Sequence, residues 1–361
     1  MTSPAAVATD WLSDDRRRRM LAGAGVSAGA AVTAGLLLRR LRMLDLDGKV
    51  VLITGGSRGL GLALGREFAR RGARLAICSR SQDQLTAAKS DLEGFGAEVL
   101  ATSCDVGDAE DVQRLVDATV ARYGTIDVLV NNAGIISVGP VETQRVEDFH
   151  AAMDVMFWGV VHPTLAVLPL MRPRRTGRIV TITSIGGKLS APHLLPYNSA
   201  KFAAVGFSEG LRAELARSGI KVTTVVPGLM RTGSHLNGWF RGDSSAEFTW
   251  FALGATLPGV SMPAERAARR IVRAARRGKP ELILTPQAKV VARLAPLFPG
   301  LTARTLSLMN RLLPQSPPVG GPGRLGWDSQ SRVTASPLTA LGERAARRFN
   351  QLNGRSRSRS S

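Results

Sequence analysis

Short apolar runs alternate with longer amphipathic stretches from Lys49 onward, and this alternation is the strongest pattern in the chain. The short runs, rich in β-branched residues, predict strands at 51–54, 74–78, 99–104, 126–130, 178–183 and 221–226. The longer stretches predict helices at 81–94, 110–123, 146–171 and 200–218, and one that runs from the first glycine-rich loop through Arg71. Strands and helices that alternate in this way imply right-handed crossovers. The pattern therefore predicts an α/β fold, a doubly wound parallel sheet of the Rossmann type, over residues 48–285.

The leader before this domain, residues 1–47, contains a run of 19 residues without a charge at 20–38. As a helix this run would measure about 28 Å, close to the thickness of a bilayer core. Its many alanines and glycines make spanning marginal. We predict an N-terminal hydrophobic helix that associates with a membrane. A dispensable leader and a cleaved export signal are the alternatives.

The chain carries a net charge of +20, and +15 of it lies after residue 263. A nearly neutral body therefore precedes basic appendages, an arrangement that suits an anionic membrane surface better than a nucleic-acid recognition fold. We expect residues 286–361 to form a basic, partly helical C-terminal extension: amphipathic helices at 288–313, a Pro/Gly-rich linker, a helix within 338–352 and a disordered Arg/Ser tail. A merely solvated basic face is the alternative.

Composition narrows the class of protein further. Hydrophobic residues make up 44% of the chain, which excludes wholesale disorder. The two cysteines, Cys78 and Cys104, cannot form a disulfide framework, and no Cys/His cluster has the spacing of a metal site. We expect both cysteines to be buried, and we expect the protein on the cytoplasmic side.

A glycine-rich loop follows the first predicted strand and opens a helix, which is the context of a dinucleotide-binding loop. Glycines there allow a tight turn and a close approach of the pyrophosphate to the helix N-terminus. The expected cofactor-binding residues of this loop are Thr54, Gly55, Ser57, Arg58, Gly59, Leu60 and Gly61.

The end of the second strand indicates which dinucleotide binds. A carboxylate there would prefer the ribose of NAD, but the chain has Ser79 and Arg80, with Arg58 in the loop nearby. Two guanidinium groups and a hydroxyl suit a 2′-phosphate, and we expect no acid to compete there. The sequence therefore favours NADP(H) over NAD(H).

Further motifs follow later strands in a fixed order: Asp105 with Val106, Asn132-Ala133-Gly134, Ser184, Tyr197-x-x-x-Lys201, and Pro227-Gly228 with Thr232. Together with the glycine loop, these motifs resemble the short-chain dehydrogenase/reductase family over residues 48–280. The resemblance implies that Asp105 and the Asn132 motif line the adenine side, that Pro227 to Thr232 touch the nicotinamide end, and that the protein forms a homo-oligomer.

The residue types also carry a chemistry of their own. Tyr197 and Lys201 lie one helical turn apart, and we expect the ammonium to lower the pKa of the phenol so that it exchanges a proton with substrate. Ser184 would stabilise charge on a carbonyl oxygen. These three residues are the expected catalytic set, with the roles that the resemblance also implies.

One position departs from the family pattern. Where relatives commonly have an asparagine that orders a proton-relay water, this chain has Met156. We expect the enzyme to work nevertheless, because the assistance from Ser184 and Tyr197 does not depend on residue 156.

The only indication of the type of substrate is a set of five aromatic residues in the loop expected to cover the substrate: Trp239, Phe240, Phe248, Trp250 and Phe251. They predict a lid over a lipophilic alcohol or carbonyl compound. Docking on a membrane or partner, and plain packing of the lid, are alternatives. The leading hypothesis is an oxidoreductase at the inner face of a membrane. A 3-oxoacyl thioester reductase and a cofactor-binding scaffold without activity are the competing hypotheses.

Overall fold

The computed structural model describes residues 43–315, 323–334, 336 and 339–352. The uncharged run at 20–38 and the Arg/Ser tail lie outside these residues. The chain divides into two units, Met1–Leu44 and Asp45–Ser361, and the description below concerns the second.

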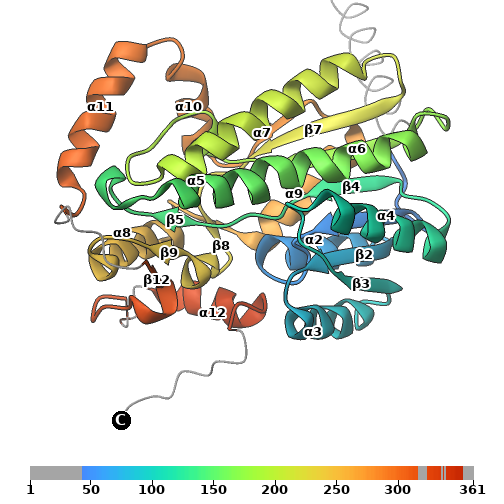
Figure 1. Ribbon diagram of the computed structural model, residues 1–361, viewed down its shortest axis with the longest axis horizontal. Helices are drawn as coiled ribbons and strands as arrows, with labels where there is room; N and C mark the ends of the chain where they lie inside the picture. Colours follow the sequence, from blue (N-terminus) through green and yellow to red (C-terminus); the bar gives the residue numbers. More distant parts are fainter. Residues whose placement is uncertain (1–42, 316–322, 335, 337–338, 353–361) are drawn as a thin grey trace, which may run out of the picture. The chain divides into compact units, whose positions relative to one another are not determined.

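Seven parallel strands form the central sheet, in the spatial order β11-β7-β6-β4-β1-β2-β3 (Figure 1). The strands are β1 (Val50–Thr54), β2 (Arg74–Ser79), β3 (Val99–Ser103), β4 (Val128–Asn131), β6 (Gly177–Ile182), β7 (Ile220–Val226) and β11 (Glu281–Ile283). The chain moves outward from β1 to β3 and then returns to place β4 on the other side of β1. This reversal is the switch point at which doubly wound folds bind ligands, and the predicted fold class is confirmed.

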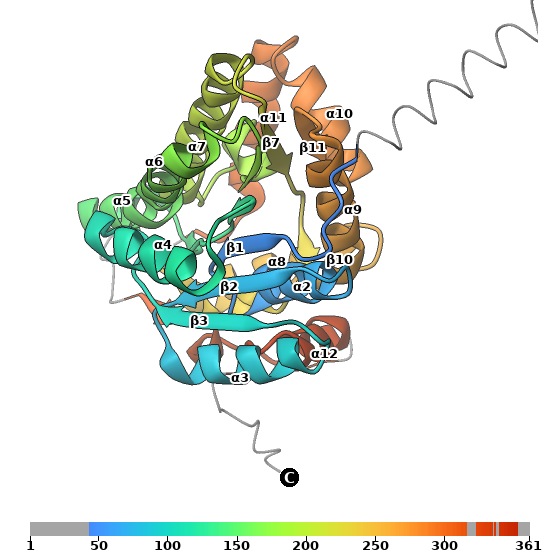
Figure 2. The same cartoon turned by 90° about the vertical axis from the view of Figure 1, so that its right-hand side faces the viewer.

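Helices cover both faces of this sheet (Figure 2). One face carries α2 (Gly59–Ala69), α3 (Gln82–Glu93) and α9 (Ala264–Arg277), and the other carries α4 (Ala109–Tyr123), α5 (Val146–Met153), α6 (Gly159–Met171) and α7 (Leu195–Glu214). Local sequence sets their ends: Asp108 accepts hydrogen bonds from the amides of Glu110 and Asp111, and Gly124 ends α4 in the left-handed conformation. Cys78 and Cys104 are both buried, as expected.

The main differences from the sequence prediction concern three elements. The helix expected over Val146–Met171 is divided by a π-helical turn, η2 (Asp154–Trp158). Helix α7 begins at Leu195 rather than at residue 200, because Pro196 supplies a favourable first turn. The three-residue strand β11 was not predicted, because so short a run carries too little periodicity.

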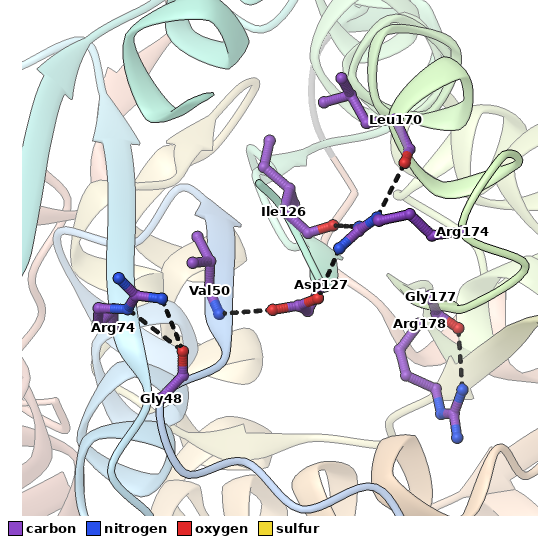
Figure 3. A network of polar contacts seen from close by, with 9 residues as sticks. All are labelled: Gly48, Val50, Arg74, Ile126, Asp127, Leu170, Arg174, Gly177 and Arg178. Carbon is purple, nitrogen blue, oxygen red and sulfur yellow. Dashed lines mark hydrogen bonds and ion pairs between the residues drawn. The ribbon is translucent and has the colours of Figure 1, made fainter. Parts of the chain in front are cut away.

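Polar contacts at the amino ends of the strands join β1, β4 and α6 (Figure 3). The Asp127 carboxylate accepts from the amide of Val50 at 3.1 Å and from the Arg174 guanidinium at 3.0 Å. Arg174 also donates to the carbonyl oxygens of Ile126 and Leu170. This network lies at the sheet edge opposite the predicted site, so its role is to stabilise the fold.

A lid subdomain is built from β5 and from elements that follow β7. They are β5 (Ser137–Val138), β8 (Met230–Arg231), η4 (Ser234–Asn237), β9 (Trp239–Phe240), α8 (Ser244–Thr256), β10 (Met262–Pro263), β12 (Arg324–Leu325), η5 (Gly326–Asp328) and α12 (Ala340–Arg348). Strand β9 lies between β5 and β12. Part of the segment after residue 285 therefore packs into the lid.

Two helices before β12 form an exposed arm, α10 (Pro286–Leu294) and α11 (Pro299–Leu312). No residue of α11 is buried. Both helices overlap the segment 288–313, for which the sequence predicts amphipathic helices. Among the described residues, the stretch Val146–Met171 is long and apolar enough to cross a membrane, but it is half buried inside the fold as α5 to α6, which is typical of a core helix.

Candidate active site

The glycine loop joins β1 to α2 and is closely packed against the end of β4. A Cβ on Gly55, whose φ is 62°, would lie 2.9 Å from the Ala133 Cα atom, and one on Gly61 would lie 2.1 Å from the Gly55 carbonyl oxygen. The Asn132 side-chain amide donates to the carbonyls of Thr54 and Gly55 at 3.0 and 3.1 Å. Asn132 thus holds the loop in shape.

Thr54 completes this junction. Its hydroxyl oxygen accepts from the backbone amides of Asn132 and Ala133 at 3.0 and 3.2 Å. The glycine loop and the Asn132-Ala133-Gly134 motif, about 70 residues apart in sequence, are therefore brought together as predicted.

The end of β2 carries the basic pair expected to select the cofactor. Burial lowers the pKa of Arg58, and the positive charge of Arg80 lowers it further. The expectation that no acid competes there is wrong, because the Asp105 carboxylate lies 3.9 Å from Arg80. Both side chains are exposed, so this pair is weak and Arg80 remains available to an anion.

Asp105 and Val106 follow β3, as predicted. One Asp105 carboxylate oxygen accepts from the Gly107 amide at 3.0 Å. Val106 is buried in the main core, where a Cβ on Gly159 would clash with it. The Val106 side chain therefore contributes to the site by packing in the core.

Ser184 follows β6 and faces the helix that carries Tyr197 and Lys201. The Ser184 hydroxyl oxygen accepts from the amide of Gly186 at 3.0 Å, and Ser184 also hydrogen-bonds Tyr197. Lys201 is buried, and its ammonium donates to the Ile182 carbonyl at 2.9 Å. The three residues predicted to be catalytic are therefore neighbours.

Their titration differs from the sequence prediction. The expected lowering of the Tyr197 pKa is wrong for this structure: burial raises it, and the hydrogen bond with Ser184 opposes that rise. Desolvation lowers the pKa of Lys201 to about 8. The prediction considered only the attraction between ammonium and phenolate, whereas both groups lose water in the fold.

Met156 lies in the π-helical turn η2 and packs with Ala200 and Tyr197. This placement confirms that residue 156 is next to the catalytic helix. A thioether there has no proton to donate. π-Helical turns often occur at functional sites, and this one directs Met156 toward the catalytic helix.

The loop after β7 borders the opposite side of the site. The Pro227 carbonyl accepts from the Ile185 amide at 2.8 Å, next to Ser184. A Cβ on Gly228 would lie 2.5 Å from the Thr285 hydroxyl. The Thr232 hydroxyl hydrogen-bonds Ser234 at 2.9 Å, which fixes the start of the lid.

A buried polar pair, not predicted from sequence, joins the catalytic loop to the lid. His193, with a positive φ of 63°, lies 2.8 Å through Nδ1 from a Glu247 carboxylate oxygen. The other Glu247 oxygen accepts from the Trp250 indole at 2.7 Å. Glu247 lies 54 residues after His193, so no local pattern connects the two residues. The one signal in the sequence is that Glu247 is an acidic residue in an otherwise apolar helix, which indicates a buried carboxylate with a partner.

The aromatic residues of the lid mostly pack with one another. Phe240 and Phe248 are fully buried with ring centroids 5.2 Å apart, and Phe251 joins the same cluster. Trp239 remains half exposed. Plain packing thus accounts for much of this aromatic set.

The chain belongs to the short-chain dehydrogenase family, whose model matches residues 49–237. It is an oxidoreductase of the class that acts on CH–OH groups.

Individual relatives agree with this assignment. The chain is 36% identical to the putative oxidoreductase SadH of Mycobacterium tuberculosis, over 70% of this chain and 92% of that protein. It is 38% identical to a putative ketoacyl reductase of Streptomyces coelicolor, over 53% of this chain and 74% of that protein. Among solved structures, a variant of actinorhodin polyketide ketoreductase with NADPH superposes with a TM-score of 0.60 at 30% identity, covering 68% of this chain and 99% of that chain.

The residues present fit a nicotinamide dinucleotide. The cradle at the start of α2 has no room for side chains at Gly55 and Gly61, and the amides there suit a pyrophosphate. When bound, the dinucleotide supplies or accepts the hydride. Tyr197, protonated at neutral pH because burial raises its pKa, is able to give its hydroxyl proton to a carbonyl oxygen. Lys201, with a pKa of about 8, holds a proton that it releases readily.

Proposed function

We propose that the protein is an NADP(H)-dependent oxidoreductase that interconverts a carbonyl compound and its alcohol. The observation that carries this proposal is the meeting of Ser184, Tyr197 and Lys201 beside the glycine cradle. In the reducing direction, a bound NADPH would supply the hydride for the carbonyl carbon. Tyr197 would protonate the carbonyl oxygen, and Ser184 would stabilise the charge that develops on it.

The preference for NADP(H) is supported by electrostatics. Burial lowers the pKa of Arg58, and the positive charge of Arg80 adds to this effect, so the two guanidinium groups repel each other. A 2′-phosphate between them would remove this repulsion, whereas the ribose hydroxyl of NAD would not. The NADPH in the actinorhodin ketoreductase structure is consistent with this preference.

A lipophilic substrate is supported by exposed apolar side chains near the catalytic residues. Leu195 precedes Tyr197 on α7, Leu229 follows β7, and Trp239 lies on β9; all three are more than one-third exposed. Apolar surface at this edge of the sheet suits a substrate with a hydrocarbon part.

A screen that follows NADPH absorbance with ketones and aldehydes of graded chain length tests the proposal. We expect turnover to rise with chain length over the shorter members. Turnover limited to small polar carbonyl compounds would contradict the lipophilic substrate.

A 3-oxoacyl thioester reductase is the second candidate. The names of relatives at 38% and 39% identity, putative ketoacyl reductases of two Streptomyces species, favour it. Including a 3-oxoacyl thioester and its free ketone analogue in the same screen distinguishes the two candidates.

We also propose attachment to the inner face of a membrane through the α10–α11 arm, residues 286–312. Its exposed large apolar residues are Val290, Leu294, Leu297, Phe298, Leu301, Leu308 and Leu312. The arm carries four basic residues and no acidic one: Lys289, Arg293, Arg304 and Arg311. Apolar side chains beside unopposed positive charge are typical of interfacial helices on anionic lipid.

A homo-oligomer is proposed as well. The adjacent helices α6 and α7 expose Leu165 and Phe202, which are 55% and 44% accessible. A second copy of this chain would cover this surface.

A further inference from the structure

The end of the chain returns to the glycine loop. Residues 339–352, which we call the C-terminal strap, comprise Thr339, α12 and the four residues after it. The strap lies on the lid through two very close approaches: a Cβ on Gly233 would lie 2.5 Å from Ala346, and one on Gly342 would lie 2.3 Å from Thr256. Small residues on both sides thus fit α12 to the lid.

The last part of the strap hydrogen-bonds the glycine loop itself. The Gly59 amide, at the start of α2, donates to the Phe349 carbonyl at 2.9 Å. The Asn350 side-chain amide donates to the carbonyls of Ser57 and Gln84 at 3.0 and 3.1 Å. Asn350 therefore ties the glycine loop to the start of α3, which follows the basic end of β2.

Side chains strengthen this attachment. The ring of Phe349 is buried, with the Arg66 guanidinium 5.4 Å from its centroid. Arg66 also donates to the Arg348 carbonyl at 2.9 Å, and Arg348 pairs with Glu265 of α9 at 2.7 Å. The strap is anchored to α2 and α9 as well as to the lid.

Gln351 extends the connection to the segment after Thr232. Its backbone and side-chain oxygens accept from the Asn237 amide at 2.9 and 2.8 Å. Its own amide nitrogen lies 2.8 Å from where a Cβ on Gly59 would be. One buried residue thus joins the phosphate side of the site to the side expected to hold the nicotinamide.

We propose that the C-terminal strap positions the cofactor-binding groove, with Asn350 and Gln351 as its positioning residues. A loop this rich in glycine is costly to order, and a strap that orders it beforehand removes that cost from cofactor binding. Within the described residues, only one backbone amide of the first turn of α2, that of Gly59, donates to the strap. The amides of the next two residues, Leu60 and Gly61, make no hydrogen bond with it. The strap therefore holds the loop and leaves amides for the pyrophosphate.

The proposal on the strap depends on the proposed function only because it requires that the protein binds a nicotinamide dinucleotide. Because the strap contacts the loop backbone rather than Arg80, it affects NADPH and NADH equally. This equality distinguishes the strap from the residues that select the cofactor.

The test uses the full chain with Asn350→Asp, which keeps the size of the side chain and tolerates the positive φ of 54° but cannot donate to two carbonyls. We expect the Kd values for NADPH and NADH to rise by the same factor, about threefold to tenfold, as for a lost hydrogen bond of ordinary strength. In the cofactor-free protein, amide hydrogen exchange of residues 55–62 should be faster than in the parent.

Three further variants complete the test, one disruptive and two as matched controls. Gln351→Leu should act like Asn350→Asp, and Gln351→Glu, which retains the acceptor for Asn237, should restore binding toward the parent. Thr339→Val removes hydrogen bonds of a buried hydroxyl in the same strap, away from the loop, and should leave both measurements unchanged.

Three outcomes would overturn the proposal. Tighter cofactor binding by Asn350→Asp would show that the strap obstructs the groove. A changed ratio of NADPH to NADH affinity in Gln351→Leu, which adds no charge, or unchanged affinity and exchange in both disruptive variants, would show that the strap positions nothing. A parent that binds neither dinucleotide contradicts the proposed function as well, whereas parental binding that Asn350→Asp leaves unaltered contradicts the strap alone.

Discussion

Lys201 lies in an environment far from that of a free side chain. Burial lowers its pKa from 10.5 to about 8. Between these two values the unfolded chain binds a proton that the folded protein does not, so the folded protein becomes more stable as pH rises through this window. Below about pH 8 both states are protonated, and the burial penalty is constant.

A comparison with Lys201→Met isolates this contribution. Urea unfolding at pH 8 and pH 10.5 should show the parent gaining about 3 kcal/mol relative to the variant, since each pKa unit corresponds to about 1.4 kcal/mol. Parallel pH profiles for the two proteins would mean that the ammonium is not desolvated in the fold.

Arg80 carries the prediction on cofactor choice. Arg80→Asp should weaken NADPH binding by about tenfold or more and strengthen NADH binding, because a carboxylate repels the 2′-phosphate and accepts from the ribose. Fluorescence titration with both dinucleotides measures this change. Arg122→Asp, an equal charge change at an exposed position on α4, is the control. Comparable affinities for the two cofactors in the parent would refute the assignment.

At the scale of elements, strands that are apolar runs in the sequence were predictable. Contacts between residues far apart in the sequence were not. The runs that became β1, β2 and β7 are apolar enough to be found from sequence, and the glycine loop and Tyr197-x-x-x-Lys201 motif placed the site. His193 and Glu247 meet across 54 residues, and Phe349 reaches Gly59 across 290, so no local pattern contains either contact. The pKa of Tyr197 was predicted in the wrong direction because sequence does not give burial.

The α10–α11 arm carries the prediction on membrane binding. Leu301→Glu with Leu308→Glu should abolish sedimentation of the full chain with anionic vesicles at low salt, because each substitution removes apolar contact worth about 2 kcal/mol and adds a repelled charge. Val141→Glu, on another exposed loop of the body, should bind like the parent.

The dependence of vesicle binding on salt and on lipid charge gives a second test of the arm. Binding should decline as ionic strength rises and should be weak on neutral vesicles. If the doubly substituted chain sediments like the parent, the arm does not attach the protein.

At the scale of the whole molecule, a nearly neutral catalytic body is joined to basic segments with different placements. One basic segment, the arm, is exposed, and another, the strap, returns to the glycine loop. In our proposals the C-terminal part of the chain has two separate roles: the arm would bind lipid, and the strap would position the cofactor groove. We expect the catalytic body to work with Met156 at the position where relatives commonly have an asparagine, because the assistance from Ser184 and Tyr197 does not depend on residue 156.

The most direct test of the account is NADPH oxidation by three full-length proteins with a medium-chain ketone. The parent should turn over, Tyr197→Phe should lose about two to four orders of magnitude in kcat while binding NADPH normally, and Met156→Asn should change the rate only modestly. A parent that binds NADPH without reducing any carbonyl compound, and that gains activity with Met156→Asn, would contradict the account and show a binding module that has lost its catalysis.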